Sequence, residues 1–161
     1  MSPERMIVRP AAAEDGPSIL DLIRQLGYDV DTNRYLPLLR VLLHRDSHCM
    51  LVAEMDRAVV GFVNVHFRVF FRYGDLVATV DELCVDEGHR DQGIGAELMG
   101  TVIAICRQRG AHHIELTTNK RREAALRFYQ RLGFEVTSHK LVYMLASAPE
   151  APREEEAHAA R

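Results

Sequence analysis

The sequence predicts an α/β (α+β) fold in which a mixed central β-sheet of six to seven strands is flanked by about four helices. Three observations predict this class. A run rich in β-branched residues, Val77–Val85, precedes a segment with apolar residues at helical spacing, Ile94–Arg109. Predicted strands and helices alternate along much of the chain, which favours helices packed on a sheet. Hydrophobic residues make up 47% of the 161 residues, enough for a sizeable core in a chain of one-domain length.

The N-terminal part of the chain predicts one strand and two helices. Met6–Pro10 is the strand, and a helix follows near Glu14–Leu26 with Gly27 as its C-cap. A second helix spans roughly Thr32–His44. Pro37 is expected in its first turns, because a proline deeper in a helix removes a backbone hydrogen bond.

The middle of the chain predicts three consecutive strands and a long helix. Cys49–Glu54 and Val59–Val69 have the alternation of a hairpin. The turn Phe70–Asp75 follows them and leads to the Val77–Val85 strand. The helix Ile94–Arg109 comes next, so the chain here passes from a hairpin into a strand–helix unit.

The C-terminal part predicts a strand at His112–Thr118, a helix at Glu123–Leu132 and a last strand at Thr137–Leu145. The composition then becomes rich in alanine, glutamate and proline, which is typical of a segment without a packed core. We therefore expect one domain over residues 1–146 and a charged tail over residues 147–161.

Charge and cysteine content exclude several classes of protein. The 20 Lys and Arg residues nearly balance the 23 Asp and Glu residues, so nothing favours nucleic acid as a partner. No signal peptide and no apolar run of about 18 residues is present, so we expect a cytoplasmic protein without a membrane partner. Cys49, Cys84 and Cys106 are odd in number and are expected as free thiols. Neither these cysteines nor the histidines have the spacing of a metal site, and we expect no metal.

The segment Arg90-Asp91-Gln92-Gly93-Ile94-Gly95-Ala96 lies where a strand ends and a helix begins. Its two glycines let a ligand approach the backbone closely, and the unpaired N–H groups of a helix start suit a phosphate. The segment is not a P-loop, because Gly95 is followed by Ala96 and Glu97. It also lacks the third glycine of the Rossmann fingerprint at the required spacing.

The pattern Arg90-x-x-Gly93-x-Gly95 resembles the acyl-CoA pyrophosphate loop of the GNAT (GCN5-related N-acetyltransferase) superfamily. The resemblance extends along the chain from about Met6 to Leu145. Its further elements are an opening strand and helix, a strand that ends at an asparagine, a helix with an aromatic pair and a closing Gly-Phe: Ile7–Pro10, Asn119, Ala124-Ala125-x-x-Phe128-Tyr129 and Gly133-Phe134. At the level of single families, it is weakly nearest to aminoalkylphosphonate acetyltransferases.

This resemblance implies a GNAT fold whose splayed strands hold acyl-CoA, with acetyl-CoA as the cofactor. It assigns the pantetheine arm to the backbone of Leu83, Cys84 and Val85, and the pyrophosphate to the loop of Arg90, Asp91, Gln92, Gly93, Ile94, Gly95 and Ala96. Asn119 is expected to hydrogen-bond the cofactor, with a role as a strand-end turn residue as the alternative. Dimers are common in the family, so we also expect a homodimer.

Acetyl transfer to an amine needs a general base. An amine with a pKa near 10.4 is protonated at pH 7, and its conversion to the neutral form costs about 4 kcal/mol. Related enzymes often place an acid or a histidine nine or eleven residues before the loop arginine. Those positions are Asp81 and Thr79 here. Threonine is no useful base, so Asp81 is the first candidate. Simple alternation places Thr79, Asp81 and Leu83 on one face, but a bulge would exchange the faces, so Glu82 is the second.

Tyr129 is the candidate general acid. Its place in the motif resembles that of the tyrosine that contacts the CoA sulfur and protonates the departing thiolate. The alternative is a core aromatic residue beside Phe128, and only one of these two adjacent side chains needs to face the core.

The acceptor site is expected from the first loop, the second helix and the central strands: Tyr28, Asp29, Tyr35, His66, Arg68 and Thr79. His66 or Arg68 suits the phosphonate of an aminoalkylphosphonate, although that family has a glutamate in the place of Thr79. An acidic pocket of Asp29, Asp31 and Asp81 would instead suit a polyamine or an aminoglycoside-like amine. A protein or peptide amine is an alternative acceptor, and a non-catalytic acyl-CoA-binding sensor domain is the alternative to an enzyme.

Overall fold

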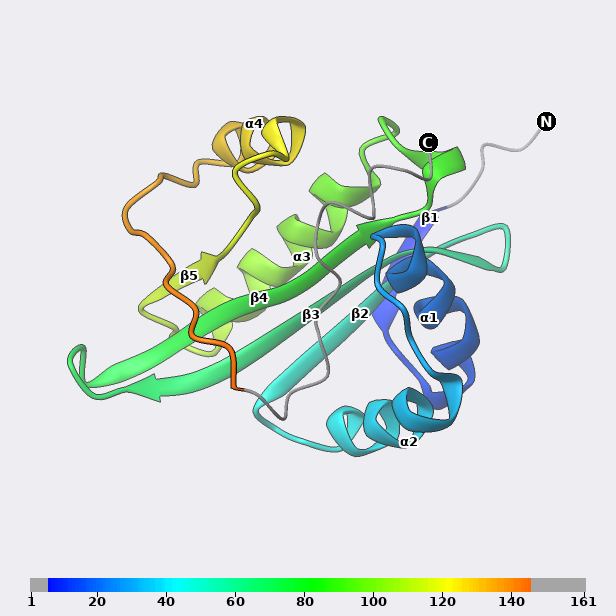
Figure 1. The fold of residues 1–161 in the computed structure, drawn as a ribbon, viewed down its shortest axis with the longest axis horizontal. Coiled ribbons are helices and arrows are strands. Elements are labelled where there is room, and N and C mark those ends of the chain that lie inside the picture. Colours follow the sequence, from blue (N-terminus) through cyan, green and yellow to red (C-terminus); the bar gives the residue numbers. More distant parts are fainter. Residues whose placement is uncertain (1–5, 146–161) are drawn as a thin grey trace. The chain divides into compact units, whose positions relative to one another are not determined.

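A computed structural model describes residues 6–145 of the chain (Figure 1). The predicted charged tail, residues 147–161, lies outside the described residues. The chain forms two compact units, Met1–Glu115 and Leu116–Arg161. None of the helices within residues 6–145 is long and apolar enough to cross a membrane.

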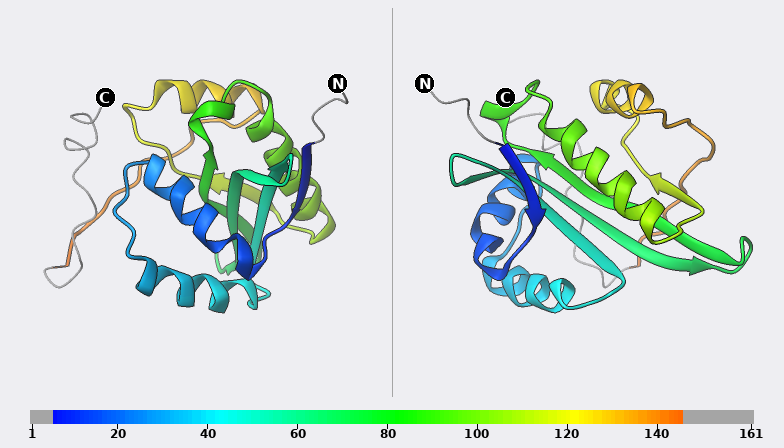
Figure 2. Two further views of the ribbon diagram at one scale, coloured as in Figure 1. Left: turned by 90° about the vertical axis from the view of Figure 1, so that its right-hand side faces the viewer. Right: turned by 180° about the vertical axis from the view of Figure 1, so that it is seen from behind.

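The sheet has five strands in the order β1-β2-β3-β4-β5. Their bounds are β1 (Met6–Pro10), β2 (His48–Met55), β3 (Ala58–Phe70), β4 (Asp75–Val85) and β5 (His113–Leu116). The strands β1 to β4 pair antiparallel. A helical crossover joins β4 to β5, and their arrows point the same way in Figures 1 and 2, so the sheet is mixed as predicted.

The helices agree with the predicted elements to within a few residues. They are α1 (Gly16–Gln25), α2 (Thr32–Leu43), α3 (Ile94–Gln108) and, in the second unit, α4 (Glu123–Arg131). A 3₁₀ turn, Ala13–Asp15, takes the place of the first predicted helical residues. The carboxylate of Asp31 accepts a hydrogen bond from the Asn33 N–H at 3.0 Å and caps α2.

Within the first unit, α1 and α2 cover one face of the sheet and α3 covers the other (Figure 2). The core beneath α1 and α2 consists of buried side chains from both helices and three strands: Ile19, Leu22, Leu39, Met50, Val52, Phe62 and Cys84. On the opposite face, a Cβ at Gly61 would lie 3.0 Å from both Ile94 and Leu98. The close packing of α3 on β3 therefore depends on glycine at that position.

A β-bulge interrupts the pairing of β3 with β4. Asn64 pairs with Glu82 and Val65 pairs with Val80, so Asp81 is an extra residue on β4. Thr79, opposite His66, therefore lies on the same face as Glu82. The simple alternation that placed Thr79 with Asp81 and Leu83 is wrong here, because the bulge shifts the pleat by one residue.

The structure corrects the predicted number of strands. Residues 137–145 form no strand, so the strand expected at Thr137–Leu145 is wrong and the described sheet has five strands instead of six or seven. Several of these side chains are exposed, including Leu141 at 94% and Tyr143 at 88%. Apolar alternation marks a segment that is able to form a strand, but the strand forms only where another backbone pairs with it.

Candidate active site

One face of the sheet changes from apolar to polar along β3. The side chain of Phe62 lies in the core beneath α1 and α2, whereas the next residues on the same face are polar. We call this group the polar strip. Its members, on four neighbouring strands, are His48 of β2, Asn64, His66 and Arg68 of β3, Thr79 and Glu82 of β4, and Glu115 of β5.

Glu82 is the partly buried carboxylate of the polar strip. The Nδ2 group of Asn64 donates a hydrogen bond to Glu82 Oε2 at 2.8 Å. Burial raises the pKa of Glu82 above its usual range, the bond from Asn64 offsets part of that rise, and the charge of Asp81 adds to it. A carboxyl group with a raised pKa is better matched to proton transfer near neutral pH than an ordinary one.

Glu115 joins three elements of the polar strip. Arg68 Nη2 donates to Glu115 Oε1 at 2.9 Å, and Thr79 Oγ1 donates to the same oxygen at 3.2 Å. Burial alone would raise the pKa of Glu115, but the bonds from Arg68 and Thr79 outweigh it and hold that pKa below its usual range. The guanidinium group of Arg68 is therefore paired with a carboxylate of the strip itself.

Two histidines stack at the β2 side of the polar strip. The ring centroids of His48 and His66 lie 4.7 Å apart, with an angle of 23° between their planes. Burial lowers the pKa of His48, the neighbouring His66 and Arg45 lower it further, and Asp81 opposes them. Asp81 itself is exposed at the bulge. Besides the two histidines, the strip contains the carboxyl groups of Glu82 and Glu115 and one guanidinium group, that of Arg68.

The glycine loop after β4 ends in an open helix N-terminus. Gly93 has φ +81°, and a Cβ there would meet no atom of the described residues within 4 Å. No side chain caps the first turn of α3, whose first residue is Ile94. The N–H groups of this turn and the helix dipole are therefore available to an anion such as a phosphate group.

The segment before the loop is tied to α1. Gln25 Nε2 donates to Asp86 Oδ1 at 2.9 Å, and Gln25 Oε1 accepts from the Glu87 N–H at 2.9 Å. Asp86 also accepts a bond from His89 Nδ1 at 2.6 Å. Gln25 therefore fixes the position of the chain just before Arg90, a role that its place in an amphipathic helix does not indicate.

The end of β4 extends beyond β5. The His112 N–H donates to the Leu76 carbonyl oxygen at 2.8 Å, and β5 is four residues long. At about 3.3 Å per residue, β5 ends before it reaches Leu83. The backbone of Leu83, Cys84 and Val85 therefore pairs with β3 on one side and has an edge that β5 does not cover.

The second unit contains Tyr129 and Asn119. Tyr129 is half-buried on α4, and its ring lies 5.1 Å from Phe128 and 5.7 Å from Phe134 between centroids. Phe128 is half-buried as well, so neither aromatic residue is purely a core residue of this unit. Asn119 Oδ1 accepts from the Arg121 N–H at 2.8 Å, which is the turn role that the sequence left open.

The predicted acceptor residues separate into two groups. His66, Arg68 and Thr79 come together in the polar strip. Tyr28 and Asp29 are exposed in the loop after α1, and Tyr35 is half-buried on α2. Within residues 6–145, no hydrogen bond or ion pair joins these last three to the strip, and no group of three metal-ligating side chains occurs.

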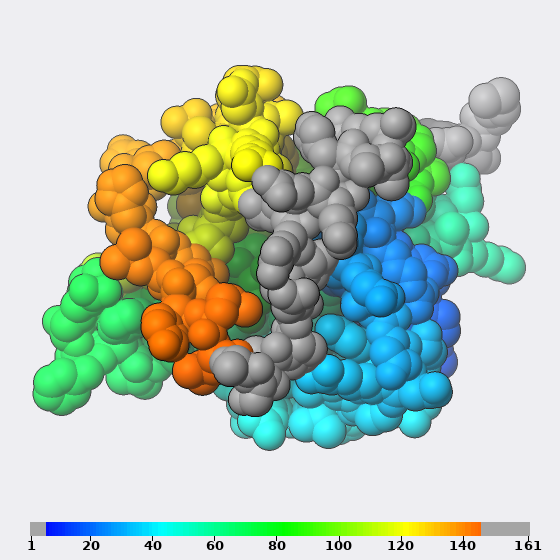
Figure 3. All heavy atoms as spheres, viewed as in Figure 1, coloured from blue at the N-terminus to red at the C-terminus, as the bar shows by residue number. Residues whose placement is uncertain are grey.

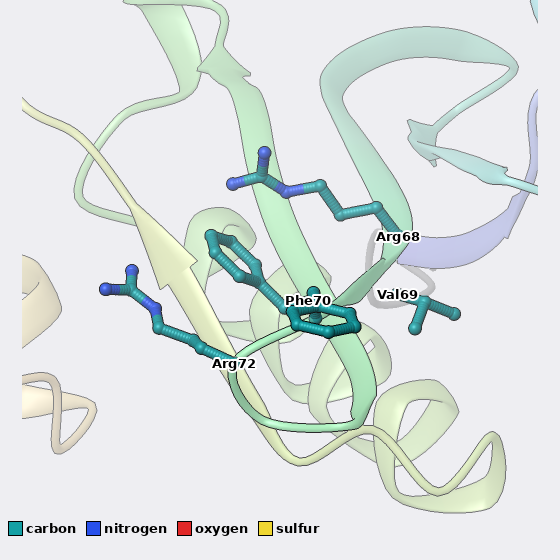
Figure 4. A pocket seen from close by; sticks show the side chains of 5 residues that line it. Arg68, Val69, Phe70 and Arg72 are labelled. Carbon is teal, nitrogen blue, oxygen red and sulfur yellow. The ribbon is translucent and has the colours of Figure 1, made fainter.

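Arg68 also borders an open hollow at the tip of the β3–β4 hairpin. The hollow measures about 590 Å³ and is lined by Arg68, Val69, Phe70, Phe71 and Arg72. The Phe70 ring lies between two guanidinium groups, with its centroid 4.4 Å from the Arg68 Cζ and 4.8 Å from the Arg72 Cζ (Figure 4). In Figure 3 the hairpin tip (green, lower left) is exposed at the surface, away from α1 and α2 (blue and cyan).

Sequence reasoning missed Asn64, His48 and Glu115 as members of the polar strip. One signal was available for Asn64, because it interrupts a run in which Phe62, Val63 and Val65 are all buried. A polar residue inside such a run usually has a specific partner. His48 and Glu115 join the site only through strand pairing. The residues next to them in the sequence do not indicate which strands pair.

Comparisons with protein families and with curated proteins both match this chain to N-acetyltransferases. The family described as "Acetyltransferase (GNAT) family" matches residues 17–134. An aminoalkylphosphonate N-acetyltransferase of Salmonella typhimurium is 32% identical over 133 residues, which are 80% of this chain and 84% of that protein. An uncharacterized N-acetyltransferase of Methanocaldococcus jannaschii is 33% identical over 102 residues, 58% of this chain but only 42% of that protein.

Among solved structures, an aminoglycoside N-acetyltransferase in complex with CoA superposes with a TM-score of 0.81. The match covers 91% of this chain and 99% of that one at 20% sequence identity. At this identity the likeness concerns the fold, which agrees with the strand order and the helix placement described above.

Proposed function

The chain belongs to the GNAT acetyltransferase family, and we propose that it moves an acetyl group directly from acetyl-CoA to a primary amine of a small molecule. The family makes it an acyltransferase. The observation on which the proposal chiefly depends is that β4 and α3 combine, in one unit, a partly buried carboxylate with an uncapped helix N-terminus. Acyl transfer to an amine needs these two features: a proton acceptor and a site for the cofactor's phosphates.

Acetyl-CoA, when bound, supplies the acetyl group as a thioester. The amides of Gly93 to Ala96 would hold its pyrophosphate, with Arg90, Asp91 and Gln92 in the same loop. The backbone edge of Leu83, Cys84 and Val85 would pair with the pantetheine arm, because β5 does not cover it. Asn119 would hydrogen-bond the cofactor through its amide nitrogen, because its side-chain oxygen already accepts a hydrogen bond from the Arg121 N–H.

Glu82 is the proposed general base. Its partial burial and raised pKa support this role, and the bulge turns it to the same face as Thr79 and His66. It would take the proton of the acceptor ammonium before the amine attacks. Asp81, the first candidate from the sequence, is exposed, and its negative charge would attract the cationic acceptor to the strip.

Tyr129 is the proposed general acid. Its phenol would donate its proton to the sulfur as the carbon–sulfur bond breaks, so that neutral CoA leaves. Its position in the Ala-x-x-Phe-Tyr motif supports this role, and its half-buried side chain leaves part of the ring open to a ligand.

The charges of the polar strip favour a cationic acceptor, such as a polyamine or an aminoglycoside-like amine. Glu82 and Glu115 contribute two carboxyl groups to the strip, and Asp81 adds a third at the bulge beside it. The guanidinium group of Arg68 on β3 is already paired, because it donates a hydrogen bond to Glu115 at 2.9 Å. Tyr28, Asp29 and Tyr35 would extend the same site from the side of α2.

An aminoalkylphosphonate is the second candidate acceptor. The relative that acts on this class shares 32% identity over most of both chains. A phosphonate would have to take Arg68 from Glu115, which a doubly charged, bidentate acceptor is able to do. This acceptor therefore predicts a strong dependence of KM on Arg68, whereas a polyamine predicts a weak one.

Release of free CoA from acetyl-CoA tests the proposal on a panel of spermidine, sisomicin, 2-aminoethylphosphonate and a lysine peptide. We expect turnover with at least one small amine, faster than hydrolysis without an acceptor. Turnover with the peptide alone would replace the small-molecule assignment. Tight CoA binding without turnover on any amine would indicate a sensor domain and overturn the enzymatic proposal.

We also expect a homodimer. Val69 and Phe71 at the hairpin tip are 74% and 100% exposed, and apolar side chains of this size are often covered by a partner. Light scattering after size exclusion at micromolar concentration measures the mass directly, and a monomer mass would contradict this expectation.

A further inference from the structure

Asn64 is an unusual residue for its position. It is 6% exposed in the centre of β3, where its neighbours Phe62, Val63 and Val65 are all buried and apolar. Among residues 6–145, Asn64 and Asp15 are the polar side chains that are buried to this degree. Both carboxylate oxygens of Asp15 accept hydrogen bonds, from Arg9 and from the Ala12 N–H, whereas the side-chain oxygen of Asn64 accepts none from the described residues.

The two ends of the Asn64 amide differ in their hydrogen bonding. Nδ2 donates to Glu82 Oε2 at 2.8 Å. Oδ1 is buried, and within the described part of the chain it has no hydrogen-bond partner. A buried acceptor without a donor destabilises a fold, so an apolar side chain of similar size would suit this position better if packing alone decided it.

We propose that Asn64 is a positioning residue for the transfer reaction, which holds the Glu82 carboxylate in place through its amide while the bulge at Asp81 turns that carboxylate to the open polar strip. The expected effect of Asn64 on turnover rests on the proposed function, in which Glu82 is the general base. The bond between Asn64 and Glu82 joins paired residues on β3 and β4, so it also fixes the carboxylate of Glu82 relative to β3.

The surroundings of Glu82 show why one amide has a large effect. The other titratable and charged groups on this face are Cys84 on β4, His66 and Arg68 on β3, His48 on β2 and Glu115 on β5, and Asp81 lies beside Glu82 at the bulge. The buried side chains of α1 and α2 are apolar. Among the described groups, Asn64 gives Glu82 its hydrogen bond and Asp81 acts on it by charge, in the opposite direction.

The experiment compares Asn64→Leu with Met50→Leu in the full-length protein. Leucine is close to asparagine in size and has no amide. Met50 pairs with Asn64 across β2 and is 7% exposed, so Met50→Leu is a matched change in the same packing environment without loss of the hydrogen bond. Asn64→Asp is a second variant that keeps the shape but replaces the donor with a carboxyl group.

The first readout needs no turnover. The side-chain ¹³C signal of Glu82, identified by its loss in Glu82→Gln, is titrated with pH. We expect the titration midpoint of Glu82 to move to higher pH in Asn64→Leu, and also in Asn64→Asp because two adjacent carboxyl groups resist joint ionisation. We expect no such movement in Met50→Leu. An unchanged midpoint in both Asn64 variants would overturn the proposal.

The second readout separates positioning from a structural role. In Asn64→Leu, kcat/KM at pH 7 should fall roughly ten-fold through kcat, with the rising limb of its pH profile displaced to higher pH. Resistance to urea should change little, because removal of the unpaired oxygen offsets the loss of the hydrogen bond to Glu82. Loss of stability with unchanged kcat in the folded fraction would overturn the proposal. If the midpoint of Glu82 moves but the protein acetylates no amine, the proposed function is refuted. Asn64 would then still be the residue that holds the Glu82 carboxylate and lowers its titration midpoint.

Discussion

Two opposing influences act on the carboxyl group of Glu82. Burial and the nearby charge of Asp81 favour its neutral form, whereas the hydrogen bond from Asn64 favours its ionised form. Burial prevails, so the folded-state pKa lies above that of the unfolded chain. The same residue therefore reduces the stability of the fold at neutral pH and is suited to accept a proton there.

Glu82→Gln should lower kcat/KM by roughly 10²- to 10⁴-fold, because a glutamine accepts no proton. It should also raise the melting temperature at pH 8. A group whose folded pKa is raised contributes stability below its unfolded pKa, about 4.3, and loses it as pH rises through the folded value. The increase in melting temperature caused by Glu82→Gln should therefore be larger at pH 8 than at pH 4, as measured by thermal unfolding at both pH values. Asp81→Asn, at the exposed neighbour, is the control and should show no comparable gain.

Tyr129→Phe removes one hydroxyl group and keeps the ring contacts with Phe128 and Phe134. A phenol with a pKa near 10 is able to protonate a thiolate with a pKa near 8.5, so kcat should fall roughly ten- to a thousand-fold. Acetyl-CoA affinity and melting temperature should change little. Tyr143→Phe, at a tyrosine that is 88% exposed in the same unit, is the control. Normal turnover in Tyr129→Phe would return this residue to a packing role.

At the scale of elements, the segment from β4 to α3 brings three local irregularities together. The bulge at Asp81 turns Glu82 to the polar strip, the end of β4 passes β5, and the loop enters α3 through residues with positive φ. Asp91 at φ 62° and Gly93 at φ 81° belong to that loop. A left-handed conformation at a residue other than glycine costs free energy and is often found at functional sites.

Gly93→Val should abolish CoA binding, because the added side chain would occupy the space over the first turn of α3. It also introduces backbone strain, which must be separated from the loss of the site. Gly110→Val is a matched control, since Gly110 has φ +69° and equally open surroundings at the other end of α3. Both variants should lose similar stability in urea unfolding, and only Gly93→Val should lose affinity in calorimetry. Equal CoA affinity in the two variants would reject the loop as the cofactor site.

At the scale of the whole molecule, charged contacts connect the N-terminal strand to the rest of the first unit. Arg9 on β1 donates to both carboxylate oxygens of Asp15 at 2.8 and 2.9 Å, and to Glu54 on β2 at 2.8 Å. The hydrogen bond from Arg9 holds the pKa of Asp15 below its usual range, against the effect of burial. This network fixes the approach of the chain to α1, which covers the apolar part of the sheet.

Asp15→Asn should therefore lower the free energy of unfolding by about 2–3 kcal/mol at pH 7, because it leaves Arg9 partly buried without a full partner. A group with a depressed folded pKa contributes stability above its unfolded pKa, about 3.9, and loses it as pH falls through the folded value. The difference from the wild type should thus shrink towards pH 2. Asp21→Asn breaks an exposed pair with Arg24 and should change stability by less than about 1 kcal/mol. Urea unfolding at both pH values measures both variants, and a similar effect of the two would contradict this account.

The sequence by itself determined the family, the fold class and the order of most elements. Helical spacing over Ile94–Gln108 and alternation in the β2–β3 hairpin are local patterns, so they are visible in a single chain. The glycine loop was also evident, because a strand end, two glycines and a helix start are adjacent in sequence. Proposals for Tyr129 and the loop rest on such contiguous motifs.

Only the tertiary structure decided which polar residues share a face. One extra residue at Asp81 reverses the pleat, and no local pattern specifies where a bulge falls. Glu115, Thr79 and Arg68 meet because β5 lies beside β4, and Asn64 meets Glu82 across two strands. The predicted strand over residues 137–145 failed for the same physical reason. Strand formation and side-chain partnership both depend on a second backbone, whose position is a property of the folded chain and not of the segment itself.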